Sequence, residues 1–344
     1  LVASGSGNIA SFTAINTGNS QITATITVTP MHLTCPGVPE TFTITVNPSP
    51  AVNQPANQVL CNNTTANITA FTGTVSGAIY NWVNNNPSIG LAASGSGNIT
   101  SFIAINTGNI PVTATITVTP SFAGCPGIPR TFTITVNPTP DVAQPANQAL
   151  CNAAVSNPVT FPGQINGTIY NWTNNNPSIG LAASGTGNIP SFTAINTGST
   201  MVTANITVTP TAAGCPGTPK SFTIRVNPTP NVVRPADQTL CNNAVTNAVG
   251  FSSSVTGTIF VWTNNNPSIG LAATGNGNIP AFTAVNTGTV PVTATITVTA
   301  TATGCSGNPE SFTITVNPTP NINQPANQSL CNGSVTTAIA CAGA

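Results

Sequence analysis

Charged side chains are nearly absent from this sequence. Its 344 residues include four Lys and Arg and four Asp and Glu, so that the formal net charge is zero. Soluble domains usually contain about one quarter charged residues. A chain with so little charge has no basic surface for nucleic acid, no polybasic segment for anionic lipid and no acidic segment for a basic partner. We therefore expect no nucleic-acid partner.

Titratable groups suited to catalysis or metal binding are also scarce. The one histidine is His32, and the four acids, Glu40, Asp141, Asp237 and Glu310, are far apart in the sequence. General acid–base and nucleophilic catalysis need such groups to converge, and calcium sites need clustered carboxylates. We therefore predict that this chain is not an enzyme, has no catalytic residues, and binds no cofactor and no metal.

Long hydrophobic runs and helical periodicity are missing too. Hydrophobic residues make up 40% of the chain, but they occur in short alternating runs. A membrane-spanning helix needs about 18 or more consecutive apolar residues, so we predict a chain that is not embedded in a membrane. Residues 1–10 lack the basic and apolar regions of a signal peptide. We therefore interpret Leu1 as an internal residue of a longer precursor.

What the sequence does contain is a repeat of 90 residues. The motif Asn-Pro-(Ser/Thr)-Pro begins at Asn47, Asn137, Asn227 and Asn317, and other motifs keep the same spacing. This length suits one small β-domain per repeat. The predicted domains are 1–47 (the C-terminal half of a repeat), 48–137, 138–227 and 228–317 (whole repeats), and 318–344 (the N-terminal part of another). The partial ends are either a window on a longer array or ends that complement one another between chains.

Strict alternation predicts the strands. In Val112–Thr119 and Thr131–Val136 every apolar side chain alternates with Thr, as in half-buried antiparallel strands. Further strands are predicted at 57–60, 66–72, 79–83 and 99–106. The fold class is therefore all-β: a tandem array of immunoglobulin-like sandwiches with almost no helix. One Trp in each repeat lies on the third predicted strand, where such a sandwich has its core aromatic residue; these are Trp82, Trp172 and Trp262.

Cysteines recur at two positions of each repeat, and we interpret them as structural disulfide candidates. They are Cys35, Cys61, Cys125, Cys151, Cys215, Cys241, Cys305 and Cys331; Cys341 has no periodic counterpart. One pairing lies within a repeat, as Cys61 with Cys125, Cys151 with Cys215 and Cys241 with Cys305. The other joins adjacent repeats, as Cys61 with Cys215 and Cys151 with Cys305. Either pairing implies an oxidising compartment, and the sequence leaves both open.

The connections between repeats are predicted to be stiff. Each contains two prolines, which fix φ and bias the preceding residues to extended geometry. These rigid linkers contain Pro48 and Pro50, Pro138 and Pro140, Pro228 and Pro230, and Pro318 and Pro320. We expect the array to form an extended rod.

The repeated motifs resemble a known family. The runs Asn-Asn-Asn-Pro-Ser-Ile-Gly-Leu-Ala-Ala from Asn84, Thr-Ala-Thr-Ile-Thr-Val-Thr from Thr113 and Asn-Pro-Thr-Pro from Asn137 are similar to PKD-like (polycystic-kidney-disease-type) repeats of giant Bacteroidetes cell-surface adhesins, including gliding-motility adhesins. The resemblance implies type IX secretion, display on the outer membrane of a bacterial cell, and the structural shaft of an adhesin filament for attachment or gliding motility.

Three other functions remain open from the sequence. The chain could be a secreted carbohydrate-binding protein, an ice-binding protein that uses its Thr rows, or a subunit of a fibre that polymerises head to tail. The expected partners are neighbouring repeats of the same long chain. Other copies of the chain are further expected partners, through lateral self-association, since uncharged strand edges pair readily. Surface glycans are also expected partners.

Overall fold

The computed structural model describes residues 1–343, which fall into two compact units. The first unit comprises Leu1–Ala143, Phe161–Asn171 and Thr209–Lys220. The second comprises Gln144–Thr160, Trp172–Val208 and Ser221–Ala344, so the boundary between the units runs through the second repeat. No helix in residues 1–343 is long and apolar enough to span a membrane.

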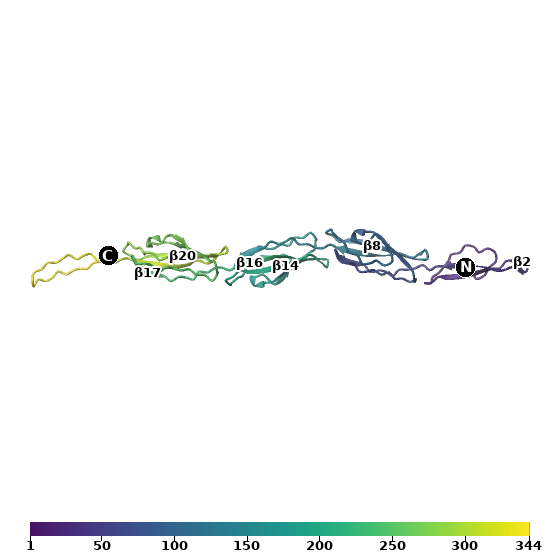
Figure 1. The fold of residues 1–344 in the computed structure, drawn as a ribbon, viewed down its shortest axis with the longest axis horizontal. Helices are drawn as coiled ribbons and strands as arrows, with labels where there is room; N and C mark the ends of the chain where they lie inside the picture. The colour runs from purple at the N-terminus through teal and green to yellow at the C-terminus, as the bar shows by residue number, and fades with distance from the viewer. Residues whose placement is uncertain (344) are drawn as a thin grey trace. The chain divides into compact units, whose positions relative to one another are not determined.

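We call the whole repeats 48–137, 138–227 and 228–317 the first, second and third repeats. The first unit contains the sheet of the first repeat, in which Figure 1 labels strand β8. The order of the strands in the sheet is β5-β10-β8-β6-β7, and the short β9 pairs with β8. Strand β5 is parallel to β10, whereas each neighbouring pair in the series β10, β8, β6 and β7 is antiparallel. The bounds are β5 (Gln58–Cys61), β6 (Ile79–Asn84), β7 (Ser94–Ser96), β8 (Val112–Phe122), β9 (Cys125–Pro126) and β10 (Arg130–Asn137).

The alternating pattern explains how this sheet is buried. The apolar residues of β8 and β10 face the core, where Ile116, Val118 and Ile134 have no exposed surface. The intervening threonines lie on the opposite face, and the hydroxyls of Thr113 and Thr135 are 2.9 Å apart across the two strands. Because successive side chains of a strand point to opposite faces, the period of two predicted both strands, and the prediction is confirmed.

The opposing layer is less regular than predicted. Residues 66–72 and 99–106 form no ladder and are joined by isolated bridges, Thr65 with Ile103 and Thr69 with Ile99. The prediction of two regular strands there was wrong. Backbone bonds still join the segments at intervals, as between Thr69 and Ile99. Next to them a side-chain oxygen takes the place of a backbone partner: the backbone N–H of Phe71 donates to Oδ1 of Asn98 at 2.9 Å. Short polar side chains compete with sheet ladders in this way.

The Trp side chains lie in the cores. Trp82 is 7% exposed and lies opposite Gly95 of β7. A Cβ on Gly95 would be 2.2 Å from Cζ2 of Trp82, so the indole ring occupies the space of a side chain there. The first repeat also has a short 3₁₀ helix, η1 (Pro87–Ile89), which ends at Gly90 with φ of 93°. Only glycine adopts that conformation at low cost.

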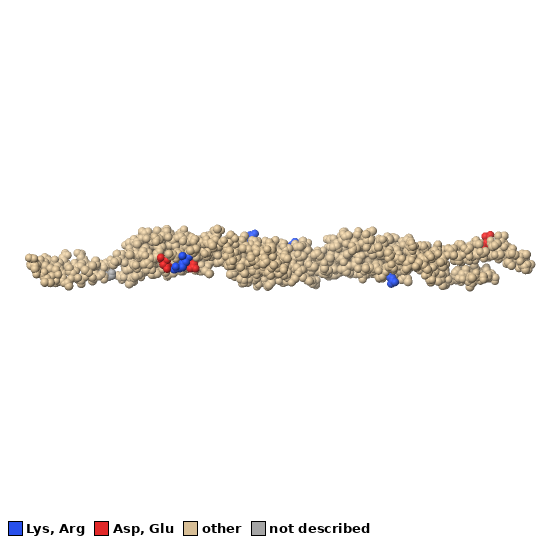
Figure 2. Space-filling view, turned by 90° about the horizontal axis from the view of Figure 1, so that it is seen from below, with Lys and Arg blue, Asp and Glu red and all other residues tan. Residues whose placement is uncertain are grey.

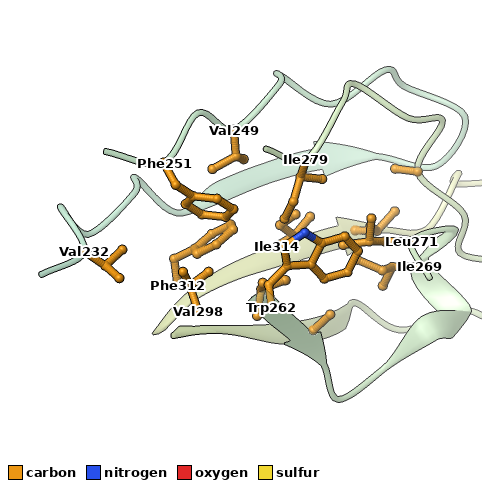
Figure 3. Close-up of a cluster of buried hydrophobic side chains, with 14 of the residues drawn as sticks. Val232, Val249, Phe251, Trp262, Ile269, Leu271, Ile279, Val298, Phe312 and Ile314 are labelled. Carbon is orange, nitrogen blue, oxygen red and sulfur yellow. The ribbon is translucent and has the colours of Figure 1, made fainter. Parts of the chain in front are cut away.

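The second unit contains the third repeat, whose sheet has the order β17-β22-β20-β18-β19 with β21 paired to β20. Its core is drawn in Figure 3, where Trp262 lies beside Ile269 and Leu271, and Phe251 lies beside Phe312. The centroids of the two Phe rings are 6.4 Å apart. The bounds are β17 (Gln238–Cys241), β18 (Ile259–Asn264), η3 (Pro267–Ile269), β19 (Thr274–Asn276), β20 (Val292–Ala302), β21 (Cys305–Ser306) and β22 (Glu310–Asn317).

The second repeat has the same set of elements. Strand β11 is parallel to β16, and β15 pairs with the end of β14. The bounds are β11 (Gln148–Cys151), β12 (Ile169–Asn174), η2 (Pro177–Ile179), β13 (Ser184–Thr186), β14 (Val202–Ala212), β15 (Cys215–Pro216) and β16 (Lys220–Asn227).

The two ends of the chain contain fewer elements. Residues 1–47 form the antiparallel pair of β1 (Ile22–Val28) and β4 (Glu40–Val46), and the hairpin of β2 (Met31–His32) and β3 (Cys35–Pro36). Phe42 of β4 is 45% exposed, whereas its counterpart Phe132 in the first repeat is 2% exposed. Residues 318–343 contain no helix and no strand.

Candidate functional site: the junctions between repeats

Charged groups are few on the surface drawn in Figure 2, where acidic and basic side chains lie together at one place and the others lie singly. The residues that the structure describes contain no group of three or more His, Cys, Asp or Glu that could hold a metal ion. One ion pair is present among them, between Arg234 and Asp237 at 3.0 Å. The features that recur from repeat to repeat, and that join separate parts of the chain, lie at the junctions between repeats.

Two disulfides link adjacent repeats. Cys61 of the first repeat is bonded to Cys215 of the second, within the first unit, with Cα atoms 5.5 Å apart. Cys151 of the second repeat is bonded to Cys305 of the third, within the second unit, at 5.6 Å. Each bridge spans the same sequence separation of 154 residues. Disulfides persist in oxidising compartments, so these bridges indicate a protein that functions outside the reducing cytosol.

The parallel pairing of the first and last strands explains why the bridges lie between repeats. Cys61 is opposite Asn137, at the end of β10 where the chain leaves the repeat. Cys125 lies before the start of β10, at the hairpin. The eight residues of β10 separate the two cysteines by roughly 26 Å, whereas bonded cysteines need Cα atoms within about 7 Å. The alternative pairing of Cys61 with Cys125 is therefore wrong.

The other two pairings within repeats are also wrong, because Cys215 is bonded to Cys61, and Cys151 and Cys305 are bonded to each other. Four predicted disulfide candidates are not bonded among residues 1–343, and neither is the cysteine without a periodic counterpart. These free cysteines are Cys35, Cys125, Cys241, Cys331 and Cys341.

Hydrogen bonds surround the first bridge. Nδ2 of Asn137, the last residue of β10, donates to the carbonyl oxygen of Ala213 at 3.3 Å. Ala213 and Gly214 form the two-residue turn between β14 and β15, both with positive φ, as type I′ hairpin turns require. On the other side, Nδ2 of Asn62 donates to the hydroxyl of Thr139 in the linker at 3.2 Å. The residue that follows Cys61 thus contacts the linker, and the residue that precedes the linker contacts the hairpin next to Cys215.

The same junction is built twice more. Nδ2 of Asn227 donates to the carbonyl oxygen of Thr303 at 3.4 Å, beside the Cys151–Cys305 bridge. Nδ2 of Asn47 donates to the carbonyl oxygen of Ala123 at 3.5 Å, at a junction where Cys125 is free. The Asn of the Asn-Pro-Thr-Pro motif therefore has one recurrent role, which is to hold the hairpin of the following repeat.

The linker prolines are packed rather than solvated. Pro48, Pro50, Pro138, Pro140, Pro228 and Pro230 are buried, whereas Pro318 is half-buried and Pro320 is exposed. The carbonyl of Pro140 lies against Gly217, where a Cβ would be 1.9 Å from its oxygen, and Pro230 lies in the same way against Gly307. The glycine that follows the Cys-Pro or Cys-Ser pair is therefore required by the close approach of the linker.

A buried asparagine in each repeat was missed by sequence reasoning. Asn106 is 5% exposed, and its Nδ2 donates to the carbonyl oxygens of Ile110 and Val136 at 2.8 and 2.7 Å. Its Oδ1 accepts from the backbone N–H of Gly108 at 3.0 Å. This side chain ties the end of β10 to the preceding turn, next to the linker. The signal that could have identified it is the Asn-Thr-Gly motif, which recurs at the 90-residue period.

Two ionisable groups have shifted pKa values, both for local reasons. A hydrogen bond from the backbone N–H of Thr313, together with Arg234, lowers the pKa of Asp237. Asn57 makes the equivalent backbone contact in the first repeat, so the carboxylate replaces an amide there. Partial burial, with the charge of Asp141 nearby, raises the pKa of Tyr170.

Comparisons with known proteins agree with this architecture. The PKD-like domain family matches residues 58–140, 148–230 and 238–320, which are most of the chain. No curated protein matches the chain in sequence.

Among solved structures, the chain is similar to a fragment of titin with three immunoglobulin domains, at 10% identity and a TM-score of 0.49, over 78% of this chain and 98% of that one. It is also similar to mouse cadherin-23 EC22–24, at 10% identity and a TM-score of 0.35, over 79% and 99% of the two chains. A third is Drosophila N-cadherin EC1–4, at 13% identity and a TM-score of 0.33, over 88% and 84%. The match of three successive repeats to one family is decisive: the chain belongs to the PKD-like domain family.

Proposed function

We propose that this chain is part of the structural shaft of an extracellular cell-surface adhesin filament, in which the repeats act as stiff spacers. The filament serves attachment or gliding motility and is displayed on the outer membrane of a bacterial cell after type IX secretion. The chain itself catalyses nothing. Its partners are the neighbouring repeats of the same long chain, and the recognition of a target is the task of other parts of the filament.

One observation carries this proposal: the junctions that follow residues 137 and 227 are each fixed at several points. A disulfide, an asparagine bond to the next hairpin and a buried Pro-X-Pro linker all act between the same two repeats. Domain pairs with small polar interfaces and free linkers move relative to one another by default. Covalent bridging at a fixed spacing of 154 residues suits a spacer that must hold its neighbours in register.

The neutral surface supports the same function. Rows of threonine cover the exposed faces of β8 and β10 and need no counter-charge for hydration. Such a surface keeps its properties across changes of salt and pH, because it offers few charges to screen or titrate. A carbohydrate-binding array would need exposed aromatic platforms, and Trp82, Trp172 and Trp262 are buried instead.

The test is immunogold electron microscopy of intact cells that produce the protein, with an antibody raised against residues 48–137. Label along thin filaments that project from the cell surface is the expected result. Label confined to the medium, or to a flat surface layer, would contradict the filament and favour a secreted binding protein or a lattice component. A strain that lacks the gene is the control for the antibody.

A further inference from the structure

We propose that the disulfides connect the repeats into two continuous covalent paths that carry tension past the folded sandwiches. The function of these paths is mechanical: they limit how far the array can be extended even when its domains unfold. This inference goes beyond the role of spacer and does not depend on the location of the filament. It rests on the connectivity of the two bridges and on the parallel strand pairs.

The first path consists of two short segments and one bridge. Residues 35–61 run from a hairpin cysteine through the strand β4, a linker and β5 to Cys61. The bridge then leads to Cys215, and residues 215–241 repeat the same sequence of hairpin, last strand, linker and first strand. The path therefore leaves out residues 62–214, which contain the greater part of two repeats.

The second path has the same construction, one repeat further along the chain. Residues 125–151 contain β9, β10, a linker and β11, and the bridge from Cys151 leads to residues 305–331. No residue belongs to both paths. The bodies of the three repeats, residues 62–124, 152–214 and 242–304, lie on neither path and contain the Trp-bearing strands β6, β12 and β18.

The two paths meet as hydrogen-bonded neighbours in every whole repeat. In the first repeat β5 belongs to the first path and β10 to the second, and the two strands are parallel. In the second repeat the pair is β11 and β16, and in the third it is β17 and β22, again parallel. Each parallel pair therefore contains one strand from each path, running in the same direction.

The strands of each path are already extended in the folded state. Of residues 215–241, β16 and β17 are strands, and the residues between them include Pro228, Pro230 and Pro235. Strands rise about 3.3 Å per residue, close to the limit of about 3.6 Å for a stretched chain. A segment of this kind lengthens little under load. Tension therefore reaches the next repeat through the bridge instead of unfolding the sandwich body.

The experiment is single-molecule force spectroscopy of the whole chain, held by handles at its two ends, with and without a reducing agent. Both bridges together remove residues 62–150 and 216–304 from the shortest covalent route between the ends. Once all domains are unfolded, that route runs through residues 152–214, the body of the second repeat, because this is the shortest segment between the two bridges. The oxidised chain should therefore stop extending roughly 620 Å short of the reduced chain, at about 3.5 Å for each of about 178 residues. Because the readout is the fully extended length, it reports which cysteines are bridged and not how stable the repeats are.

Two variants separate the pairing proposed here from other pairings. C61S leaves the Cys151–Cys305 bridge, which alone removes residues 152–304, so the shortfall should decrease to roughly 540 Å. C125S is the matched control, because Cys125 is free, and should leave the shortfall unchanged. An oxidised chain as long as the reduced one would overturn the proposal. So would a C125S chain that extends roughly 220 Å further than the parent, the length of residues 62–124.

Discussion

Replacing Asn106 by alanine tests how the end of each repeat is held. The side chain donates to the carbonyl oxygens of Ile110 and Val136 and accepts from Gly108. Val136 has no exposed surface, so its carbonyl would remain buried without this partner. An unsatisfied buried group costs about 1–3 kcal/mol, and an ordinary lost hydrogen bond about 1 kcal/mol. The unsatisfied carbonyl of Val136 and the two ordinary lost bonds therefore predict a loss of about 3–5 kcal/mol in the free energy of unfolding of the first repeat.

That loss is large beside the stability of the whole repeat. Domains are stable by about 0.05–0.15 kcal/mol per residue, so a repeat of this length has roughly 5–13 kcal/mol. Native-state hydrogen exchange of the full chain measures the change locally. The slowest amides of β8 and β10 should exchange about 100- to 4,000-fold faster in the variant, at about 1.4 kcal/mol per factor of ten.

The chain supplies its own controls for this measurement. The third repeat retains the equivalent Asn286, which donates to the carbonyl oxygens of Val290 and Val316 at 2.9 and 2.7 Å, so its exchange should not change. Replacing the exposed Asn109 by alanine should leave the first repeat within about 0.5 kcal/mol of the parent. A change of less than 1 kcal/mol on replacing Asn106 would refute the reasoning that this network holds the end of the strand.

Three further predictions follow from local geometry. G95A should destabilise the first repeat by about 1–3 kcal/mol in denaturant unfolding, because the new methyl group would overlap the ring of Trp82; S94A is the control, and equal midpoints would contradict the overlap. Burial and the charge of Asp141 raise the pKa of Tyr170 in the folded state. The resulting stability is present below the pKa of the unfolded state and is lost as pH rises through the pKa of the folded state. Y170F should therefore remove this loss of stability at high pH. Thermal midpoints of parent and variant should diverge above about pH 10, and parallel curves would show that the shift is absent. The lowered pKa of Asp237 gives stability that is present above the pKa of the unfolded state and is lost as pH falls through the pKa of the folded state. D237N should therefore make the stability of the third repeat depend less on pH in acid. Hydrogen exchange of the parent and the variant, measured between pH 5 and pH 2, would show no difference if the carboxylate were not held.

The sequence alone was sufficient for the repeat, the all-β class and the two longest strands. The 90-residue period can be read directly from the sequence. Strict Thr alternation is a local signal, because residues i and i+2 of a strand lie on the same face. The same signals did not reveal that residues 66–72 and 99–106 lack regular pairing. Asn98 and its counterparts bond to the backbone there, and that competition depends on which segments are brought together.

The disulfide pairing was decided by tertiary structure. Both pairings fit the spacing of the cysteines in the sequence, and the choice depends on which end of a strand pair each cysteine occupies. The parallel alignment of β5 with β10 places Cys61 at the exit of its repeat, and the hairpin of the next repeat places Cys215 beside it. A residue pair 154 positions apart is joined by the fold of two domains and the linker between them, which no local pattern encodes. The sequence therefore determined what each repeat is, and the tertiary structure determined how the repeats are joined.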